Sequence, residues 1–145
     1  SSVIRSLLET GDVAHAVRLL GHPYRLTGTV GQGAQRGRAI GFPTANLVDV
    51  TTLIPANGVY AGWAYGPNHR YAAAIHIGPN PTFAEAARKI EVHILDFQGD
   101  LYHQSLSIDF LERVRDVRKF ASVDELRSQL QQDVQSVRLI TAEPA

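Results

Sequence analysis

The strongest constraint on the fold is the alternation of apolar and polar residues that begins at Tyr24 and recurs through the middle of the chain. A period of two is typical of strands that bury one face. It predicts strands at residues 24–30, 59–65, 70–77, 90–97 and 106–111. Parallel strands need crossover helices, and no helical pattern separates the middle strands. The chain is therefore expected to be mainly β and to form an antiparallel barrel.

Helical patterns are confined to the two ends of the chain. Ser122 and Glu125 form a capping box, and apolar residues then recur at helical spacing to about Leu139. This pattern predicts a long C-terminal helix packed against the strands. Residues 1–21 predict two short helices that end at Gly11 and Gly21. They are either a packing element of the barrel or a linker from a preceding module, and the linker is favoured.

The composition narrows the possible partners. Lys+Arg and Asp+Glu are 14 each, so bulk charge does not attract nucleic acid or an anionic membrane. The absence of cysteine excludes disulfides and thiolate catalysis, and it suits a cytoplasmic location. No apolar run approaches the length that spans a membrane. Methionine is also absent, so we expect the chain to be part of a longer protein.

Residues 41–47, Gly-Phe-Pro-Thr-Ala-Asn-Leu, are the first candidate site. Pro43 fixes its own φ and favours an extended Phe42, so Thr44 and Asn46 should point to one face, roughly 6.5 Å apart. A hydroxyl and an amide carbonyl are ligands that Mg²⁺ accepts, and one metal–phosphate group could touch both. A proline-started strand with two solvated polar residues would give the same pattern.

Residues 31–38 form a second candidate, a loop rich in glycine and arginine. Its backbone N–H groups and guanidinium groups could bind phosphate. It is not a P-loop, because the Gly-Lys-Ser/Thr ending is missing and no helix pattern follows. A solvated hairpin loop is the alternative.

A third candidate lies on the predicted strand 90–97, where Glu91 and His93 share one face and Ile90 and Val92 share the other. Glu91 is either a general base or a solvent-facing carboxylate at the end of a sheet. The preceding residues 78–83 contain Pro79 and Pro81 and are expected to be irregular. The three candidates together suit a nucleotide–Mg²⁺ site with a carboxylate base for phosphoryl transfer to an alcohol.

Five ordered motifs closely resemble the riboflavin kinase family. They are Gly-Phe-Pro-Thr-Ala-Asn-Leu at 41–47, Gly-Val-Tyr-Ala-Gly at 58–62, Asn-Pro-Thr-Phe at 80–83, Arg-Lys-Ile-Glu-Val-His at 88–93 and Leu-Tyr at 101–102. The resemblance implies a six-stranded antiparallel Greek-key barrel with a long C-terminal helix. It also implies ATP-dependent phosphorylation of the terminal ribityl hydroxyl of riboflavin, giving FMN and ADP, with Mg²⁺ accompanying ATP.

The resemblance also implies roles for individual residues. Glu91 is the expected general base, and Thr44 and Asn46 are the expected Mg²⁺ ligands. The expected ATP and phosphate contacts are Gly33, Arg36, Gly37, Phe42, Pro43, Thr44 and Asn46. The expected riboflavin contacts are Asn80, Pro81, Thr82, Phe83 and Arg113.

Two positions depart from the family pattern, which often has glycine where this chain has Ala84 and His103. Residues 1–21 resemble the stretch that joins an FMN adenylyltransferase module to the kinase in bacterial bifunctional FAD synthetases. Residues 22–145 are then the kinase domain, which alone should make FMN and not FAD. A non-catalytic flavin-binding barrel is the main alternative, and a nucleic-acid-binding barrel is a weaker one.

Overall fold

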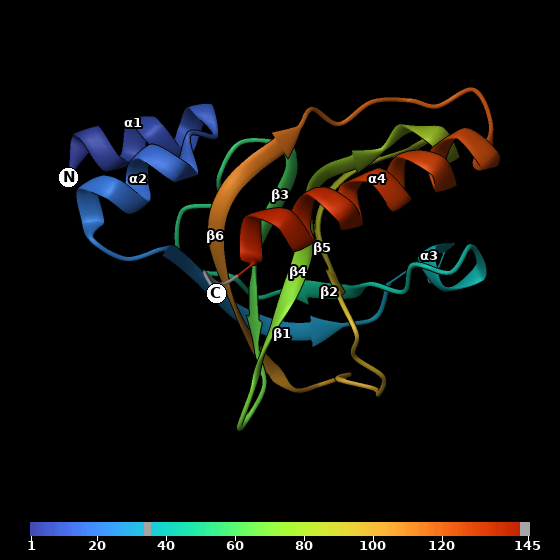
Figure 1. Cartoon of the computed structure of the whole chain (residues 1–145), viewed down its shortest axis with the longest axis horizontal. Helices are drawn as coiled ribbons and strands as arrows, with labels where there is room; N and C mark the ends of the chain where they lie inside the picture. Colours follow the sequence, from blue (N-terminus) through green and yellow to red (C-terminus); the bar gives the residue numbers. More distant parts are fainter. Residues whose placement is uncertain (34–35, 143–145) are drawn as a thin grey trace.

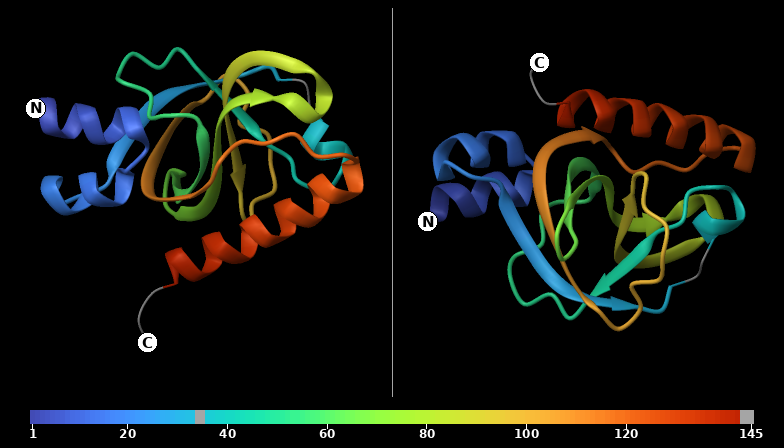
Figure 2. Two further views of the ribbon diagram at one scale, coloured as in Figure 1. Left: turned by 90° about the horizontal axis from the view of Figure 1, so that it is seen from above. Right: turned by 60° about the horizontal axis from the view of Figure 1, so that its bottom comes forward.

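The computed structural model describes residues 1–33 and 36–142. Two residues of the predicted phosphate loop, 34–35, and the end of the predicted kinase domain, 143–145, lie outside the described part. The core of the molecule is a closed six-stranded barrel, with helix α4 lying across its outside and α1 and α2 at one end (Figure 1). The helix α3 lies at the opposite end of the molecule from α1 and α2, as the views in Figure 2 also show.

All strand pairs in the barrel are antiparallel. The strands are β1 (Tyr24–Gly31), β2 (Ala45–Val48), β3 (Gly58–Tyr65), β4 (Arg70–Asn80), β5 (Glu85–Ile94) and β6 (Ser105–Arg115). Their order around the barrel is β1-β2-β5-β4-β3-β6, and β6 pairs with β1 to close it. Strands β3, β4 and β5 follow one another, and β6 returns beside β3, which is a Greek key. The predicted mainly-β barrel is confirmed.

The barrel interior holds the apolar side chains that alternate along the strands. Leu26, Ile75, Val92, Ile108 and Phe110 are fully or almost fully buried there. Their sequence neighbours point outward, because successive side chains on a strand alternate between its two faces. The polar residues of the candidate site are therefore expected on the outer wall of the barrel.

The N-terminal helices pack against the barrel. They are α1 (Ser2–Thr10) and α2 (Val13–Leu20), and each ends at a glycine with positive φ, Gly11 at 83° and Gly21 at 81°. Leu8, Val13 and Ala16 are buried in the same core cluster as the strands. This part of the chain therefore contributes to the core, and its join to another module stays a prediction.

Several element boundaries were predicted wrongly. The strand predicted at 90–97 is β5, which spans Glu85–Ile94, and the strand predicted at 106–111 is β6, which continues to Arg115. Strand β4 does not stop before Gly78 but continues to Asn80, because its register with β5 shifts between Gly78 and Asn80 and the irregularity accommodates Pro79. The next three residues form a 3₁₀ helix, η1 (Pro81–Phe83). The Gly- and Arg-rich loop contains a one-turn helix, α3 (Arg36–Ala39), although no helical pattern was expected there.

The C-terminal helix α4 (Val123–Thr141) begins as predicted. The Ser122 hydroxyl accepts a hydrogen bond from the Glu125 backbone, and the Glu125 carboxylate accepts one from the backbone of Ala121. Its buried Val137 packs with Ala61 and Leu95 on the outside of the barrel. Helix α4 therefore covers part of the outer wall. No helix in the described part of the chain is long and apolar enough to cross a membrane.

Candidate active site

A row of three polar side chains crosses neighbouring strands on the outer wall of the barrel. Asn46 on β2 pairs with Glu91 on β5, and Glu91 pairs in turn with His76 on β4. Directly paired residues present their side chains on the same face of a sheet. The adjacent Val92 points into the core and is fully buried, so the row faces outward. Strand pairing thus brings the first and third sequence candidates together.

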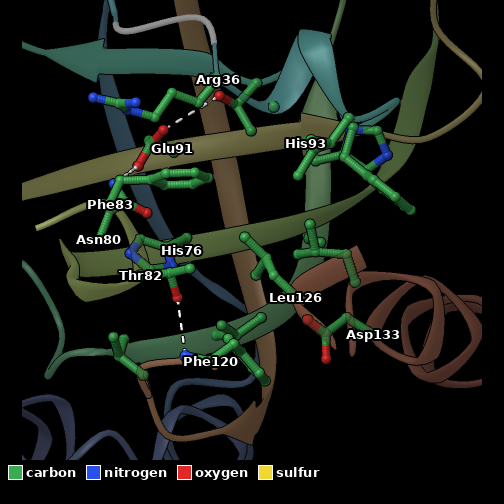
Figure 3. A pocket seen from close by; sticks show the side chains of 18 of the residues that line it. Arg36, His76, Asn80, Thr82, Phe83, Glu91, His93, Phe120, Leu126 and Asp133 are labelled. Atoms are coloured by element: carbon green, nitrogen blue, oxygen red, sulfur yellow. Dashed lines mark hydrogen bonds between the residues drawn. The ribbon is translucent and has the colours of Figure 1, made fainter. Parts of the chain in front are cut away.

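The Glu91 carboxylate is held from two sides. The side-chain amide of Asn80 donates a hydrogen bond of 2.6 Å to Oε1. The Thr44 hydroxyl lies 3.4 Å from Oε2, a long contact that leaves this oxygen open to another donor. Figure 3 shows Asn80 and Glu91 pointing toward one another above the cavity. The carboxylate therefore has one fixed oxygen and one accessible oxygen.

The Pro-Thr-Ala-Asn segment is fixed at both ends. The Pro43 carbonyl lies 2.7 Å from Nδ1 of His93, and the His93 ring meets Phe42 edge to face with centroids 5.6 Å apart. At the other end, the Asn46 amide nitrogen donates to the Gln32 carbonyl at 3.2 Å. This bond leaves Oδ1 of Asn46 available as an acceptor or metal ligand. Thr44 and Asn46 both lie beside Glu91, as their predicted common face requires.

One side of this site opens into a cavity between the barrel wall, η1, α3 and α4, which we call the helix-side cavity. Apolar side chains such as Val59, Leu126, Leu130 and Val134 form much of its lining. In Figure 3, Leu126 and Asp133 come from α4 and lie across the cavity from Glu91. A mainly apolar cleft with a few fixed polar groups is typical of a site for a small organic molecule.

Several polar groups of the helix-side cavity are already paired with one another. Arg115 donates to both carboxylate oxygens of Asp133, at 2.7 to 3.1 Å, and both side chains are largely buried. The Phe120 backbone donates to the Thr82 hydroxyl at 3.0 Å, which joins η1 to the segment before α4. The cavity therefore keeps its shape through its own internal contacts.

The other side of the site opens into a second cavity, which we call the loop-side cavity. It is bordered by the end of β1, residues 31–33, residues 43–45 and residues 97–102. Arg38 lines it, and its guanidinium makes no hydrogen bond or ion pair with any other residue that the structure describes. Thr44 lines both cavities. The two cavities therefore meet at Thr44, whose hydroxyl contacts Glu91 on the helix side, while Val92 and Ile94 of the same strand line the loop-side cavity.

The predicted site residues divide between the two cavities. Gly33, Pro43 and Thr44 line the loop-side cavity. The helix-side cavity is lined by Arg36, Gly37, Phe42, Thr44, Asn80, Pro81, Thr82, Phe83 and Glu91. Asn46 lies beside Glu91 through the strand pairing. The structure thus gathers every predicted residue except Arg113.

Arg36, one of the expected phosphate contacts, lies at the helix-side cavity. Its guanidinium forms an ion pair of 2.9 Å with Glu85 and lies over the Phe83 ring, 4.8 Å from the centroid. It therefore joins α3 to the η1 turn at the helix-side cavity. Gly37 explains why α3 can sit so close to the segment that follows it, since a Cβ there would lie 2.1 Å from the Phe42 carbonyl oxygen.

Arg113 lies away from both cavities. Its guanidinium donates to the Asn57 carbonyl at 2.7 Å and pairs with Asp116, also at 2.7 Å. Burial lowers the pKa of Arg113, but hydrogen bonds with Asp116 and Tyr60 outweigh it and hold that pKa above its ordinary value. These contacts hold β6 against the start of β3.

Arg115 takes the place beside the cavity that was expected of Arg113. On a regular strand the two residues would share a face, but the register shifts here, so that Val59 pairs with Arg115 and its neighbour Tyr60 pairs with Arg113. Val59 and Tyr60 point to opposite faces, which separates the two arginines. The contact between Arg113 and a ligand in either cavity is thus not supported.

The structure adds residues that the sequence did not single out, although the family resemblance implied a flavin contact in the segment before the last helix. His76, Arg115, Arg118, Phe120 and Asp133 line the helix-side cavity. The signal available for Phe120 and Arg118 was their position just before the capping box of α4. Leu126, Leu130 and Val134 were correctly assigned to one face of α4, but that face covers the cavity as well as the strands.

Comparisons with known proteins agree with this geometry. The riboflavin kinase (Flavokinase) family model matches residues 20–141 of the chain. The bifunctional riboflavin kinase/FMN adenylyltransferase of Bacillus subtilis is 41% identical over 139 residues, which cover 93% of this chain and 44% of that protein. The chain therefore spans less than half the length of this relative.

Two solved structures share the fold. A crystal structure described as a macrolide-efflux protein from Streptococcus pneumoniae has a TM-score of 0.86 and 40% identity, covering 95% of this chain and 46% of the other. Riboflavin kinase from Trypanosoma brucei has a TM-score of 0.60 and 26% identity, covering 84% and 82%. The family match spans most of this chain, including both cavities and Glu91. The chain belongs to the riboflavin kinase family.

Proposed function

We propose that the chain transfers the terminal phosphoryl group of ATP to the terminal ribityl hydroxyl of riboflavin, with Glu91 as the general base. The observation that carries this proposal is that Glu91 lines the helix-side cavity and contacts Thr44, the residue that lines both cavities. Phosphoryl transfer depends mainly on bringing donor and acceptor together and on neutralising charge. A carboxylate beside the residue where the two cavities meet suits that chemistry.

The helix-side cavity is the proposed riboflavin site. Its apolar lining suits the flat flavin ring, with Asn80, Pro81, Thr82 and Phe83 as contacts. Asn80 holds Oε1 of Glu91, so Oε2 is the oxygen that accepts the proton of the ribityl hydroxyl. Arg113 is left out of this proposal because it lies away from the cavity. Gly37 and Phe42 would border the transferring phosphate, since both line the cavity beside Thr44.

The loop-side cavity is the proposed ATP site, with Gly33 and Pro43 near the phosphates. Thr44 and Asn46 fit a Mg²⁺ ion, because the Thr44 hydroxyl is exposed and Oδ1 of Asn46 is not used by the bond to Gln32. An ion held by these two side chains would offset the negative charge of the phosphates. Among the described residues, no group of three or more His, Asp or Glu side chains could hold a metal ion.

The test is conversion of riboflavin to FMN by this chain with ATP, with and without Mg²⁺, followed by chromatography. We expect FMN and no FAD. Glu91→Gln keeps an oxygen for Asn80 but removes the base, so turnover should fall by about 10²- to 10⁴-fold while riboflavin still binds. Wild-type turnover in Glu91→Gln would contradict the base role. Riboflavin binding with no turnover in the unmodified chain would indicate a binding barrel instead.

The metal is tested by titration calorimetry. Thr44 and Asn46 are uncharged, so most of the affinity for Mg²⁺ should come from the nucleotide. We expect weak Mg²⁺ binding to the free chain and clear binding of Mg-ADP. Tight binding of Mg²⁺ without nucleotide would count against this assignment.

We also propose that the chain is the kinase module of a longer cytoplasmic protein that carries an FMN adenylyltransferase module. The proposal rests on the bifunctional relative, of which this chain spans 44%. The helices α1 and α2 lie at the opposite end from α3 (Figure 2), so a module joined there would leave the two cavities accessible. Making FMN with the chain alone and FAD only with the full-length protein would test it.

A further inference from the structure

His93 is a polar residue beside the site that takes no part in the proposed proton transfer or metal binding. It follows Glu91 by two residues on β5, so both side chains point to the outer wall of the barrel. Its Nδ1 lies 2.7 Å from the Pro43 carbonyl oxygen. A carbonyl oxygen can only accept a hydrogen bond, so Nδ1 carries the proton and donates. Figure 3 shows His93 on the same strand as Glu91, at the edge of the helix-side cavity.

The Pro43 carbonyl controls the path of the chain into Thr44. The proline ring fixes φ of Pro43, and the peptide bond to Thr44 is planar. The ψ angle of Pro43 is therefore the one soft backbone torsion between Pro43 and the nitrogen of Thr44, and it sets where the carbonyl points. A hydrogen-bond donor that fixes the position of the Pro43 carbonyl oxygen therefore also fixes the ψ angle of Pro43. The edge-to-face contact of Phe42 with the same ring, at 5.6 Å, fixes the residue before the proline as well.

We propose that His93 is a positioning residue that fixes ψ of Pro43 through Nδ1–H and so aims Thr44 at the metal and phosphate. This inference rests on the proposed function, which assigns Thr44 to Mg-ATP. The group that acts is the proton-bearing Nδ1, and Nε2 has no part in it. His93 is not a metal ligand through Nδ1, because that nitrogen donates to the carbonyl.

Two amide variants separate the two ring nitrogens. In His93→Asn the side-chain amide nitrogen lies where Nδ1 was, and it can donate to the Pro43 carbonyl. In His93→Gln the amide nitrogen extends to the position of Nε2 instead. His93→Ala removes both. Thermal melting followed by circular dichroism would establish that each variant folds.

The main measurement is binding of Mg-ADP by titration calorimetry, which needs no turnover. We expect His93→Asn to stay within about threefold of the unmodified chain, and His93→Gln and His93→Ala to bind about tenfold more weakly. A tenfold loss corresponds to about 1.4 kcal/mol, the range of one hydrogen bond. In the kinase assay, KM for Mg-ATP should rise in the same order while KM for riboflavin changes less.

The opposite order, with His93→Gln retained and His93→Asn weakened, would assign the role to Nε2 and overturn the inference. Equal Mg-ADP affinity in all three variants would overturn it too. If the expected order is found but the unmodified chain makes no FMN, the proposed reaction fails while the positioning role stands. If the unmodified chain does not bind Mg-ADP, both fail.

Discussion

The two cavities that meet at Thr44 differ in how their polar groups are satisfied. In the helix-side cavity, Asp133 holds Arg115, Thr82 accepts from the backbone of Phe120, and Glu85 holds Arg36. In the loop-side cavity, the Arg38 guanidinium makes no such contact within the described residues. The first cavity is preformed by its own contacts. The second cavity presents polar groups that can form their hydrogen bonds or ion pairs with a charged ligand.

This difference predicts two kinds of mutational effect. When one member of a buried pair is removed, its partner is left unsatisfied and the free energy of unfolding falls. Exposed groups without a partner contribute little to folding, and their removal should weaken ligand binding instead. Changes around the helix-side cavity should therefore lower stability, and changes around the loop-side cavity should lower affinity for nucleotide.

The largest effect is expected for Asp133→Ala. The substitution removes the only carboxylate paired with the largely buried Arg115 among the described residues and leaves it the Asp116 carbonyl and the Phe120 ring, so the free energy of unfolding should fall by about 3 kcal/mol. Urea denaturation would measure it. The double variant Arg115→Met with Asp133→Leu removes both charges and should recover most of the loss. If the free energy of unfolding falls by less than about 1 kcal/mol in Asp133→Ala, the proposed difference between the two cavities is contradicted.

Thr82→Val should have the next largest effect. It keeps the shape of the side chain but leaves the Phe120 N–H without its acceptor, at a cost of about 1 to 3 kcal/mol. Thr82→Ser keeps a hydroxyl and is the matched control. Denaturation curves for the two variants should differ. Coincident curves would mean that this bond does not hold η1 to the segment before α4.

On the loop side, Arg38→Ala should leave the unfolding free energy within about 0.5 kcal/mol of the unmodified chain. Its KM for Mg-ATP should rise about tenfold if the loop-side cavity binds ATP as proposed, because Arg38 has no hydrogen bond or ion pair with the other described residues. Arg36→Ala is the matched control, since Arg36 is already engaged by Glu85 and Phe83. A larger rise in KM in Arg36→Ala would reverse the assignment and restore Arg36 as the phosphate contact.

The smallest effect concerns the two departures from the family pattern. Ala84 and His103 have φ of 55° and 68°, in the left-handed region that favours glycine. Relief of that strain, about 1 to 2 kcal/mol, exceeds the entropy that glycine adds to the unfolded chain, about 0.4 to 1 kcal/mol. Ala84→Gly should therefore gain about 0.5 to 1 kcal/mol, seen as a rise in melting temperature. No rise would mean that the turn relaxes the strain in another way.

Much of the fold followed from local patterns. The alternation of apolar residues predicted the barrel, and the capping box placed the start of α4 at the correct residue. Strand continuity through Pro79 was missed because a register shift absorbs the proline, and single-sequence patterns carry no register. The helix α3 was missed because four residues are too few to show a helical period.

The site was predicted less completely than the fold. Thr44, Asn46 and Glu91 were chosen from motifs, and strand pairing does bring them together. Arg113 was expected from the family resemblance, and the shift in register opposite Val59 and Tyr60, which places Arg115 at the cavity instead, cannot be read from spacing. Asp133 binds Arg115, 18 residues away in the sequence, and His93 contacts the Pro43 carbonyl, 50 residues away. No local pattern contains such pairs.

Strand β2 joins β1 to β5 in the barrel with only four residues, and it carries Asn46. It pairs with β5 at Ala45 and Asn46, whereas β3 and β4 pair along their whole shared length. Amide hydrogens in β2 should therefore exchange with solvent sooner than those of β3, because local opening there breaks few bonds. If Thr44 and Asn46 bind Mg-ADP as proposed, the ligand should slow that exchange. The short β2 pairing would then report nucleotide occupancy.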